Sequence, residues 1–183
     1  MATPRRIYRI YADLRASAPQ LRDALAAKGE EIPGTVALLV TADAAKLLTR
    51  WGEEMDELCG VLDGSHLDPY IMESTQTFYW GSLFGAVKNA SWEDLRFDDN
   101  RRLAATCGIN TIAELKASAK RLAALGASAK PEKLFLLWNV ADCIYRQQTK
   151  AENRWTLEQL MEADLQEMKK RPYLAPILER IVE

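Results

Sequence analysis

Carboxylate side chains are concentrated in two neighbouring stretches of this 183-residue chain, and both stretches have the residue spacing of a helix. The side chains that could bind a cation are Glu53, Glu54 and Glu57 in the first stretch and Glu73 and Gln76 in the second. Oxygen ligands of this kind suit Mg²⁺ or Mn²⁺, ions that bridge to phosphate oxygens and keep part of their water shell. The chemistry they would support is metal-assisted attack of water on a phosphoanhydride.

The first stretch, residues 46–62, presents a single apolar stripe. Its members are Leu47, Leu48, Trp51, Met55, Leu58 and Leu62. At 100° per residue, Glu54 and Glu57 lie about 60° and about 120° from the centre of this stripe, on the same flank, and Glu53 points nearly opposite. Such a pair repels itself in isolation and can converge on one cation. The alternative is that Glu54 and Glu57 pair with Arg50 on a solvated face.

The second stretch, which follows Pro69, places polar groups within an apolar face. That face is formed by Met72, Tyr79, Trp80, Leu83 and Val87, and small residues occupy the opposite side. Glu73 and Gln76 project inside the apolar face, where a carboxylate is costly unless it is paired, hydrogen-bonded or bound to metal. The short connection 63–68 predicts two antiparallel helices that bring these side chains to one shared site.

At these residues the chain resembles the MazG-like all-α nucleoside triphosphate pyrophosphohydrolases, a superfamily that includes phosphoribosyl-ATP pyrophosphohydrolases. The family pattern is a helix with E-E-x-x-E-L, a short connection and a helix with E-x-x-D. The matching residues here are Glu53-Glu54-Met55-Asp56-Glu57-Leu58 and Glu73-Ser74-Thr75-Gln76. The resemblance covers about residues 40–90.

The resemblance implies that Glu54, Glu57 and Glu73 ligate Mg²⁺ (or Mn²⁺) and that Glu53 contributes to catalysis with Glu54, as a water-orienting base. The reaction would release pyrophosphate from a nucleotide substrate, and a homodimer is expected. The departure is Gln76, where the family carries aspartate, because an amide supplies one oxygen and no charge. The second hypothesis is therefore a catalytically degenerate helical protein that uses the same fold for oligomerisation or partner binding.

Other residues were considered for the same chemistry. Phosphate contacts are assigned to Lys46, Arg50 and Lys88, for which surface charge is the alternative. Asp142 could replace the missing aspartate, but Arg146 four residues later favours a local salt bridge. The single histidine, His66, excludes multi-histidine zinc sites, and it is interpreted as a structural or solvated residue. A ferritin-type bundle is not favoured, because it needs Glu-x-x-His motifs.

Composition predicts one cytoplasmic all-α domain over residues 1–183. Apolar residues make up 48% and charged residues 27%, and the net charge of −2 does not favour nucleic acid or a membrane as partner. No apolar run reaches the length of a membrane span. We expect a MazG-like four-helix core with its helices within about 35–90, and a helical extension over 91–183.

Capping residues and glycines predict where the helices begin and end. A helical pattern starts after Gly34 and runs to Gly64, and Asp68 followed by Pro69 predicts an N-cap with proline in the first helical position. Thr111 with Glu114, and Thr156 with Gln159, form two capping boxes. Further helices are expected over residues 5–28, about 92–105 and from Pro131 to about 150.

Overall fold

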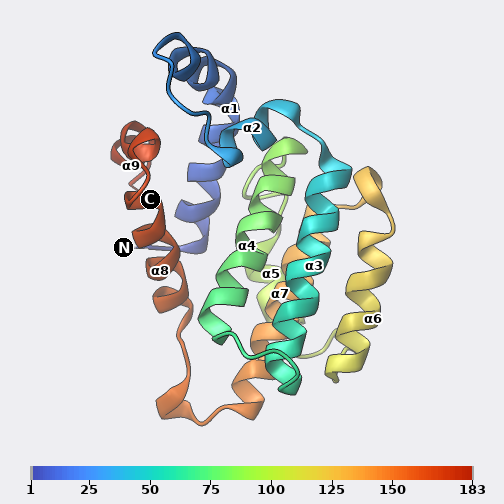
Figure 1. Ribbon diagram of the computed structural model, residues 1–183. Coiled ribbons are helices and arrows are strands. Elements are labelled where there is room, and N and C mark those ends of the chain that lie inside the picture. The colour runs from blue at the N-terminus through green and yellow to red at the C-terminus, as the bar shows by residue number, and fades with distance from the viewer. Residues whose placement is uncertain (1, 183) are drawn as a thin grey trace.

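The computed structural model describes residues 2–182, and within that range the chain forms nine α-helices, three short 3₁₀-helices and no strand (Figure 1). The α-helices are α1 (Pro4–Ala27), α2 (Gly34–Thr41), α3 (Ala44–Asp63), α4 (Tyr70–Val87), α5 (Phe97–Leu103), α6 (Ile112–Ala123), α7 (Pro131–Gln148), α8 (Leu157–Lys169) and α9 (Ala175–Arg180). The 3₁₀-helices are Gly126–Ser128, Ala151–Asn153 and Pro172–Leu174. The predicted all-α helical bundle is confirmed.

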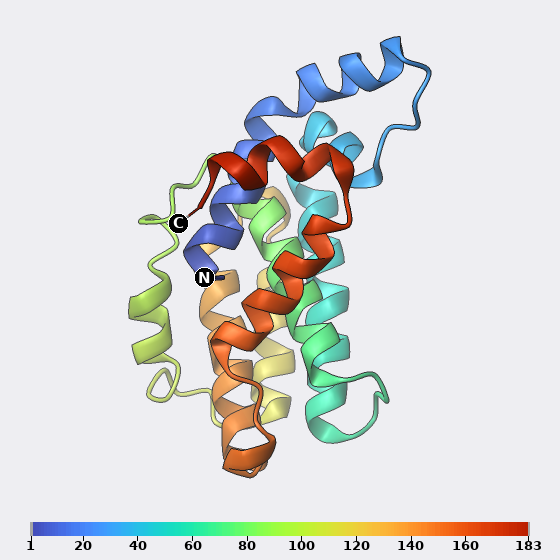
Figure 2. The same ribbon diagram turned by 90° about the vertical axis from the view of Figure 1, so that its left-hand side faces the viewer.

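Helices α3, α4 and α7 form the centre of the bundle. Helix α6 packs on the outer side of α3, and α1 packs on α4 from the other side (Figure 1). Helix α8 lies against α1 and α4, and α9 crosses α1 (Figure 2). The two ends of the chain meet there, since Arg6 Nε donates to the carbonyl of Ile181 at 3.0 Å.

One continuous hydrophobic core joins these helices. At its centre four aromatic rings pack edge to face or tilted, with centroids 5.3 to 6.1 Å apart, and they come from α4, α5 and α7. They are Phe78, Phe97, Phe135 and Trp138. The residues after position 90 therefore pack into the same core as α3 and α4. Within the described residues, no helix has both the length and the apolar character that crossing a membrane requires.

Several helix ends follow directly from their local sequence. Both predicted capping boxes form, with Thr111 and Glu114 opening α6 and Thr156 and Gln159 opening α8. Helix α3 stops at Gly64, which adopts the left-handed conformation with φ 80°. Helix α7 begins at its predicted proline.

The expected continuous helix between residues 34 and 64 is wrong, because it divides into α2 and α3. Ala42 takes a left-handed conformation with φ 52°, and the Asp43 carboxylate accepts a hydrogen bond from the Lys46 amide at 3.0 Å. Asp43 is thus a regular N-cap residue for α3. The break was missed because neither glycine nor proline marks it.

The start of α4 also differs from the prediction. Pro69 occupies the N-cap position without a side-chain cap bond, and the helix begins at Tyr70, so Asp68 is not the N-cap. The small-residue side of α4 is the more deeply buried one, because Gly81 lies against the Trp51 indole and lets the helices approach closely. Met72, assigned to the apolar face, is 37% exposed.

Candidate functional site

Helices α3 and α4 pack side by side along the stretches that carry the acidic residues. The Thr77 hydroxyl lies 2.7 Å from the Glu73 carbonyl and 3.2 Å from the Glu54 carbonyl, so it links the two helices at this level. Glu54 and Glu73 are both buried, with exposed fractions of 4% and 1%, whereas Glu57 is exposed beside them. The two helices therefore hold two carboxylates in the interior within one or two turns of each other.

These buried carboxylates lack most of the hydrogen bonds that burial normally requires. Glu54 Oε1 accepts one from Arg50 at 3.1 Å, but within residues 2–182 its Oε2 accepts none. Neither oxygen of Glu73 has a hydrogen-bond partner in the same range. Unpaired polar atoms of this kind cost about 1–3 kcal/mol each, and more when charged. Without a bound ligand, the burial of Glu54 and Glu73 close to each other is therefore electrostatically unfavourable.

Their pKa values report the same conflict. Burial raises the pKa of Glu54, the charge of Glu57 raises it further, and Arg50 opposes the rise. Burial also raises the pKa of Glu73, followed by the charges of Glu57 and Glu54, with His66 acting in the opposite sense. Burial and the charge of Glu57 thus disfavour the anionic forms of Glu54 and Glu73, and a bound cation would favour them.

His66, from the loop between α3 and α4, completes the group. Ligand atoms of Glu57, His66 and Glu73 all lie within 4.8 Å of one another. His66 Nε2 is 3.6 Å from Glu73 Oε1 and 2.9 Å from Asp68 Oδ2. Among the described residues His66 Nε2 has no hydrogen-bond partner, so its contacts with Glu73 and Asp68 are ion pairs. We call Glu54, Glu57, His66 and Glu73 the acidic cluster.

The loop holds His66 tightly against the end of α3. The His66 amide donates to the Gly60 carbonyl at 3.0 Å, and the Ser65 amide donates to Asp63 Oδ1 at 2.9 Å. A Cβ on Gly60 would lie 2.8 Å from the His66 Cβ, so a glycine is needed here for the close approach. The sequence analysis interpreted His66 as structural or solvated and did not include it among the possible ligands. The signals that could have found it were the short loop and Gly60.

Two further predicted residues lie at the edge of the acidic cluster. Glu53 is exposed and accepts a hydrogen bond from Arg50 Nη1, while Arg50 also stacks over Trp80 with its Cζ 5.2 Å from the ring centroid. Gln76 is half-buried on α4, three residues after Glu73. Arg50 is therefore shared between Glu53 and Glu54 and partly neutralises Glu54.

The remaining predicted residues are placed farther away. Lys46 is exposed on α3, about 12 Å along the helix axis before Glu54. Lys88 follows the last turn of α4, about 22 Å along the axis from Glu73, and its Nζ donates to the Ala127 carbonyl at 2.7 Å. The structure does not bring Lys88 together with the acidic cluster.

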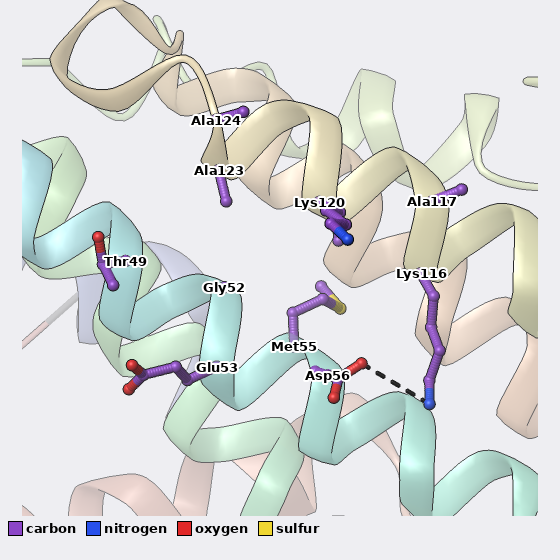
Figure 3. A pocket seen from close by; sticks show the side chains of 11 residues that line it. Thr49, Gly52, Glu53, Met55, Asp56, Lys116, Ala117, Lys120, Ala123 and Ala124 are labelled. Carbon is purple, nitrogen blue, oxygen red and sulfur yellow. Dashed lines mark ion pairs between the residues drawn. The ribbon is translucent and has the colours of Figure 1, made fainter.

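A groove of about 690 Å³ runs between α3 and α6, and no residue of the acidic cluster lines it. Glu53 and Asp56 line it from α3, and Lys116 reaches across from α6 to within 3.6 Å of Asp56 (Figure 3). Met55 and several alanines give it an apolar floor. Glu53, which directly precedes Glu54 on α3, borders this groove.

Comparison with known proteins adds no relative. No protein-family model matches the chain, and no curated protein or solved structure is significantly similar to it.

Proposed function

We propose that the protein is a divalent-metal-dependent nucleotide pyrophosphohydrolase whose ion is held by Glu54, Glu57 and Glu73. The observation that carries this proposal is the pair of buried carboxylates, Glu54 and Glu73, which come from two packed helices and have oxygens without a hydrogen-bond partner among the described residues. The residue pattern shared with the MazG-like enzymes supports the reaction class. The donor oxygens fit Mg²⁺ or Mn²⁺, which agrees with a phosphate-bearing substrate.

In this proposal the ion supplies Lewis-acid activation of the triphosphate and of a water molecule. Water attacks the α-phosphorus, the α–β phosphoanhydride bond breaks, and the products are a nucleoside monophosphate and pyrophosphate. Glu53, on the solvent side of the buried carboxylates, accepts the proton that the water releases. Arg50, which now pairs with Glu53 and Glu54, would be able to pair with a phosphate oxygen if an ion neutralised Glu54.

The substrate has room along α3. The α3–α6 groove falls within the volume range of small-ligand sites, and its apolar floor suits a nucleoside. Lys46, one turn before Arg50, extends the row of cations toward the phosphates. Lys88 has no part in this version of the site, because its position at the far end of α4 is engaged by the Ala127 carbonyl.

The test is a release assay for pyrophosphate, run on the full chain with a panel of nucleoside triphosphates, dUTP and phosphoribosyl-ATP, in Mg²⁺ and in Mn²⁺. We expect turnover of one member of the panel. Glu54→Gln and Glu73→Gln should each reduce kcat by at least 100-fold, because each removes a charge from the ion's ligands. Glu167→Gln is the matched control, since Glu167 is an exposed carboxylate on α8 that pairs with Lys170 and lies outside the groove.

Absence of turnover with every substrate would remove the hydrolase proposal in favour of the degenerate protein that Gln76 suggests. A substitution of Gln76 by Asp that creates turnover would show that the missing aspartate is the reason. Sedimentation of the full chain tests the expected homodimer independently of activity.

A further inference from the structure

The imidazole of His66 lies among the same carboxylates, although the sequence pattern of the proposed family contains no such residue. Its Nε2 atom is 3.6 Å from Glu73 Oε1, and its ligand atom lies within 4.8 Å of those of Glu57 and Glu73. Atoms that bind one ion at about 2.1 Å lie about 3.0 to 3.4 Å apart at neighbouring positions in octahedral or tetrahedral geometry. The distance between His66 Nε2 and Glu73 Oε1 is close to that range, and a rotamer change in the exposed Glu57 side chain would bring the third ligand atom closer.

Glu73 supplies a second and independent indication of a ligand. Its side chain is 1% exposed, and within residues 2–182 both of its oxygens are without a hydrogen bond. In that range its ion-pair partner is His66 alone. Native proteins pair or neutralise buried carboxylates, so these two oxygens indicate a binding partner that the chain itself does not provide.

The position of His66 is fixed rather than accidental. Its backbone amide is bonded to Gly60, its Cβ packs against the bare α-carbon of Gly60, and Gly64 turns the chain back at the end of α3. A loop histidine that is simply exposed to solvent would not need such a close approach to a glycine. The loop thus places the His66 ring beside the carboxylates that α3 and α4 contribute to the acidic cluster.

We propose that His66 is a metal ligand and that, with Glu57 and Glu73, it makes the site selective for a first-row transition ion such as Mn²⁺ or Co²⁺ over Mg²⁺. This inference rests on the metal site of the proposed function and changes the identity of the ion. Imidazole nitrogen binds Mn²⁺, Co²⁺ and Zn²⁺ well, whereas Mg²⁺ prefers oxygen and water. Asp68, 2.9 Å from Nε2, stays within reach as a partner for the ring when no ion is bound.

The experiment measures metal binding by the chelator-treated full chain, without nucleotide. Isothermal titration should give one Mn²⁺ bound at least 10-fold more tightly than Mg²⁺. Pulsed electron paramagnetic resonance of bound Mn²⁺ should show coupling to an imidazole nitrogen. His66→Gln should weaken Mn²⁺ binding by 10-fold to 100-fold, abolish the nitrogen coupling and leave Mg²⁺ binding within about threefold. The 97% exposed neighbour Leu67, changed to Ala, is the control that should change none of these.

A second variant separates position from chemistry. Gly60→Ala keeps the imidazole but forces it away from the acidic cluster, so Mn²⁺ affinity should fall about 10-fold while the helix stays folded. If His66 is only a cationic partner of Glu73 and Asp68, no nitrogen coupling will be seen and neither variant will change Mn²⁺ affinity, which overturns the proposal.

The two proposals fail separately. Mn²⁺ bound through His66 without turnover of any nucleotide would remove only the hydrolase function. Turnover supported by Mg²⁺ and unchanged in His66→Gln, with no nitrogen coupling, would remove only the role of His66.

Discussion

Two buried carboxylates, Asp142 and Glu73, lie at the first turns of α4, and they differ in the charged groups that surround them. At Tyr70 the neighbour is Asp142 of α7, which is 3% exposed. Arg146 Nε donates to it at 2.8 Å and Tyr70 Oη at 3.3 Å, and Arg101 Nη1 forms an ion pair with it at 3.5 Å. One turn later Glu73 is equally buried, yet its charged neighbours are Glu54, Glu57 and His66. The salt bridge between Asp142 and Arg146 confirms the sequence prediction.

The chain thus neutralises one buried carboxylate, Asp142, with arginine side chains, and it does not do so at Glu73. Two arginines form ion pairs with Asp142. A structural carboxylate is therefore recognisable here by its donors, and among the described residues Glu73 has no hydrogen-bond donor. This contrast is the main reason to regard the acidic cluster as a binding site rather than as part of the core.

A third buried carboxylate, Asp164 of α8, sharpens the comparison because a proton neutralises it. It is 8% exposed, the Tyr11 hydroxyl donates to Oδ1 at 3.3 Å, and burial raises its pKa from 3.8 to about 7. The folded-state pKa is raised, so stability is highest at low pH and falls as the pH rises from about 4 to about 7. The full effect is at most about 4 kcal/mol, at about 1.4 kcal/mol for each pKa unit.

The largest predicted effect is therefore that of Asp164→Asn on the pH dependence of unfolding. Between pH 5 and pH 8 the unchanged protein should lose roughly 3 kcal/mol more than the variant, measured by urea denaturation. Glu54 and Glu73 also have raised pKa values, but they are present in both proteins and cancel in the difference. Glu158→Gln, an exposed change on the same helix, is the control. Parallel pH curves for the two proteins would show that Asp164 is ionised when folded.

A smaller loss is expected from removing a donor of Asp142. Arg146→Met should destabilise the fold by about 2 kcal/mol, less than for a fully buried pair, because Arg146 is 33% exposed and Arg101 stays in place. Arg102→Met is the matched control, since Arg102 pairs with the exposed Asp99 and should cost no more than about 0.5 kcal/mol. Equal effects of the two changes in thermal denaturation would mean that Asp142 does not depend on its arginines.

Local features of the fold could be predicted from sequence, and long-range ones could not. The capping boxes at Thr111 and Thr156 depend on residues three apart, so they were found. The left-handed Ala42 breaks a helical pattern without a glycine, and α2 packs on α1, a contact that the local sequence does not show. Asp164 was missed because its burial depends on Tyr11, 153 residues away.

The acidic cluster was predictable to the same extent. The face pattern of α4 indicated that Glu73 points inward, and it is buried, although the face assigned to the core was only partly the buried one. His66 could not be found from periodicity, since a loop residue has none. Its place depends on the turn at Gly64 and on the space above Gly60, which only the folded chain defines.

The smallest predicted effect, and the one with a change of sign, is that of Glu73→Gln on stability. In chelator-treated protein the variant should be more stable than the unchanged chain by about 1 kcal/mol, because it removes a buried charge that faces two other carboxylates. Asp142→Asn should instead lose about 1 kcal/mol, because it leaves two arginines without their anion. Addition of Mn²⁺ at 100 times its dissociation constant should raise the stability of the unchanged chain by about 2.7 kcal/mol and that of Glu73→Gln by much less, so the order of the two proteins reverses. Thermal denaturation with and without the ion measures all four values. A destabilised Glu73→Gln in the absence of metal would show that Glu73 is a structural carboxylate like Asp142, and the contrast on which the metal site depends would be lost.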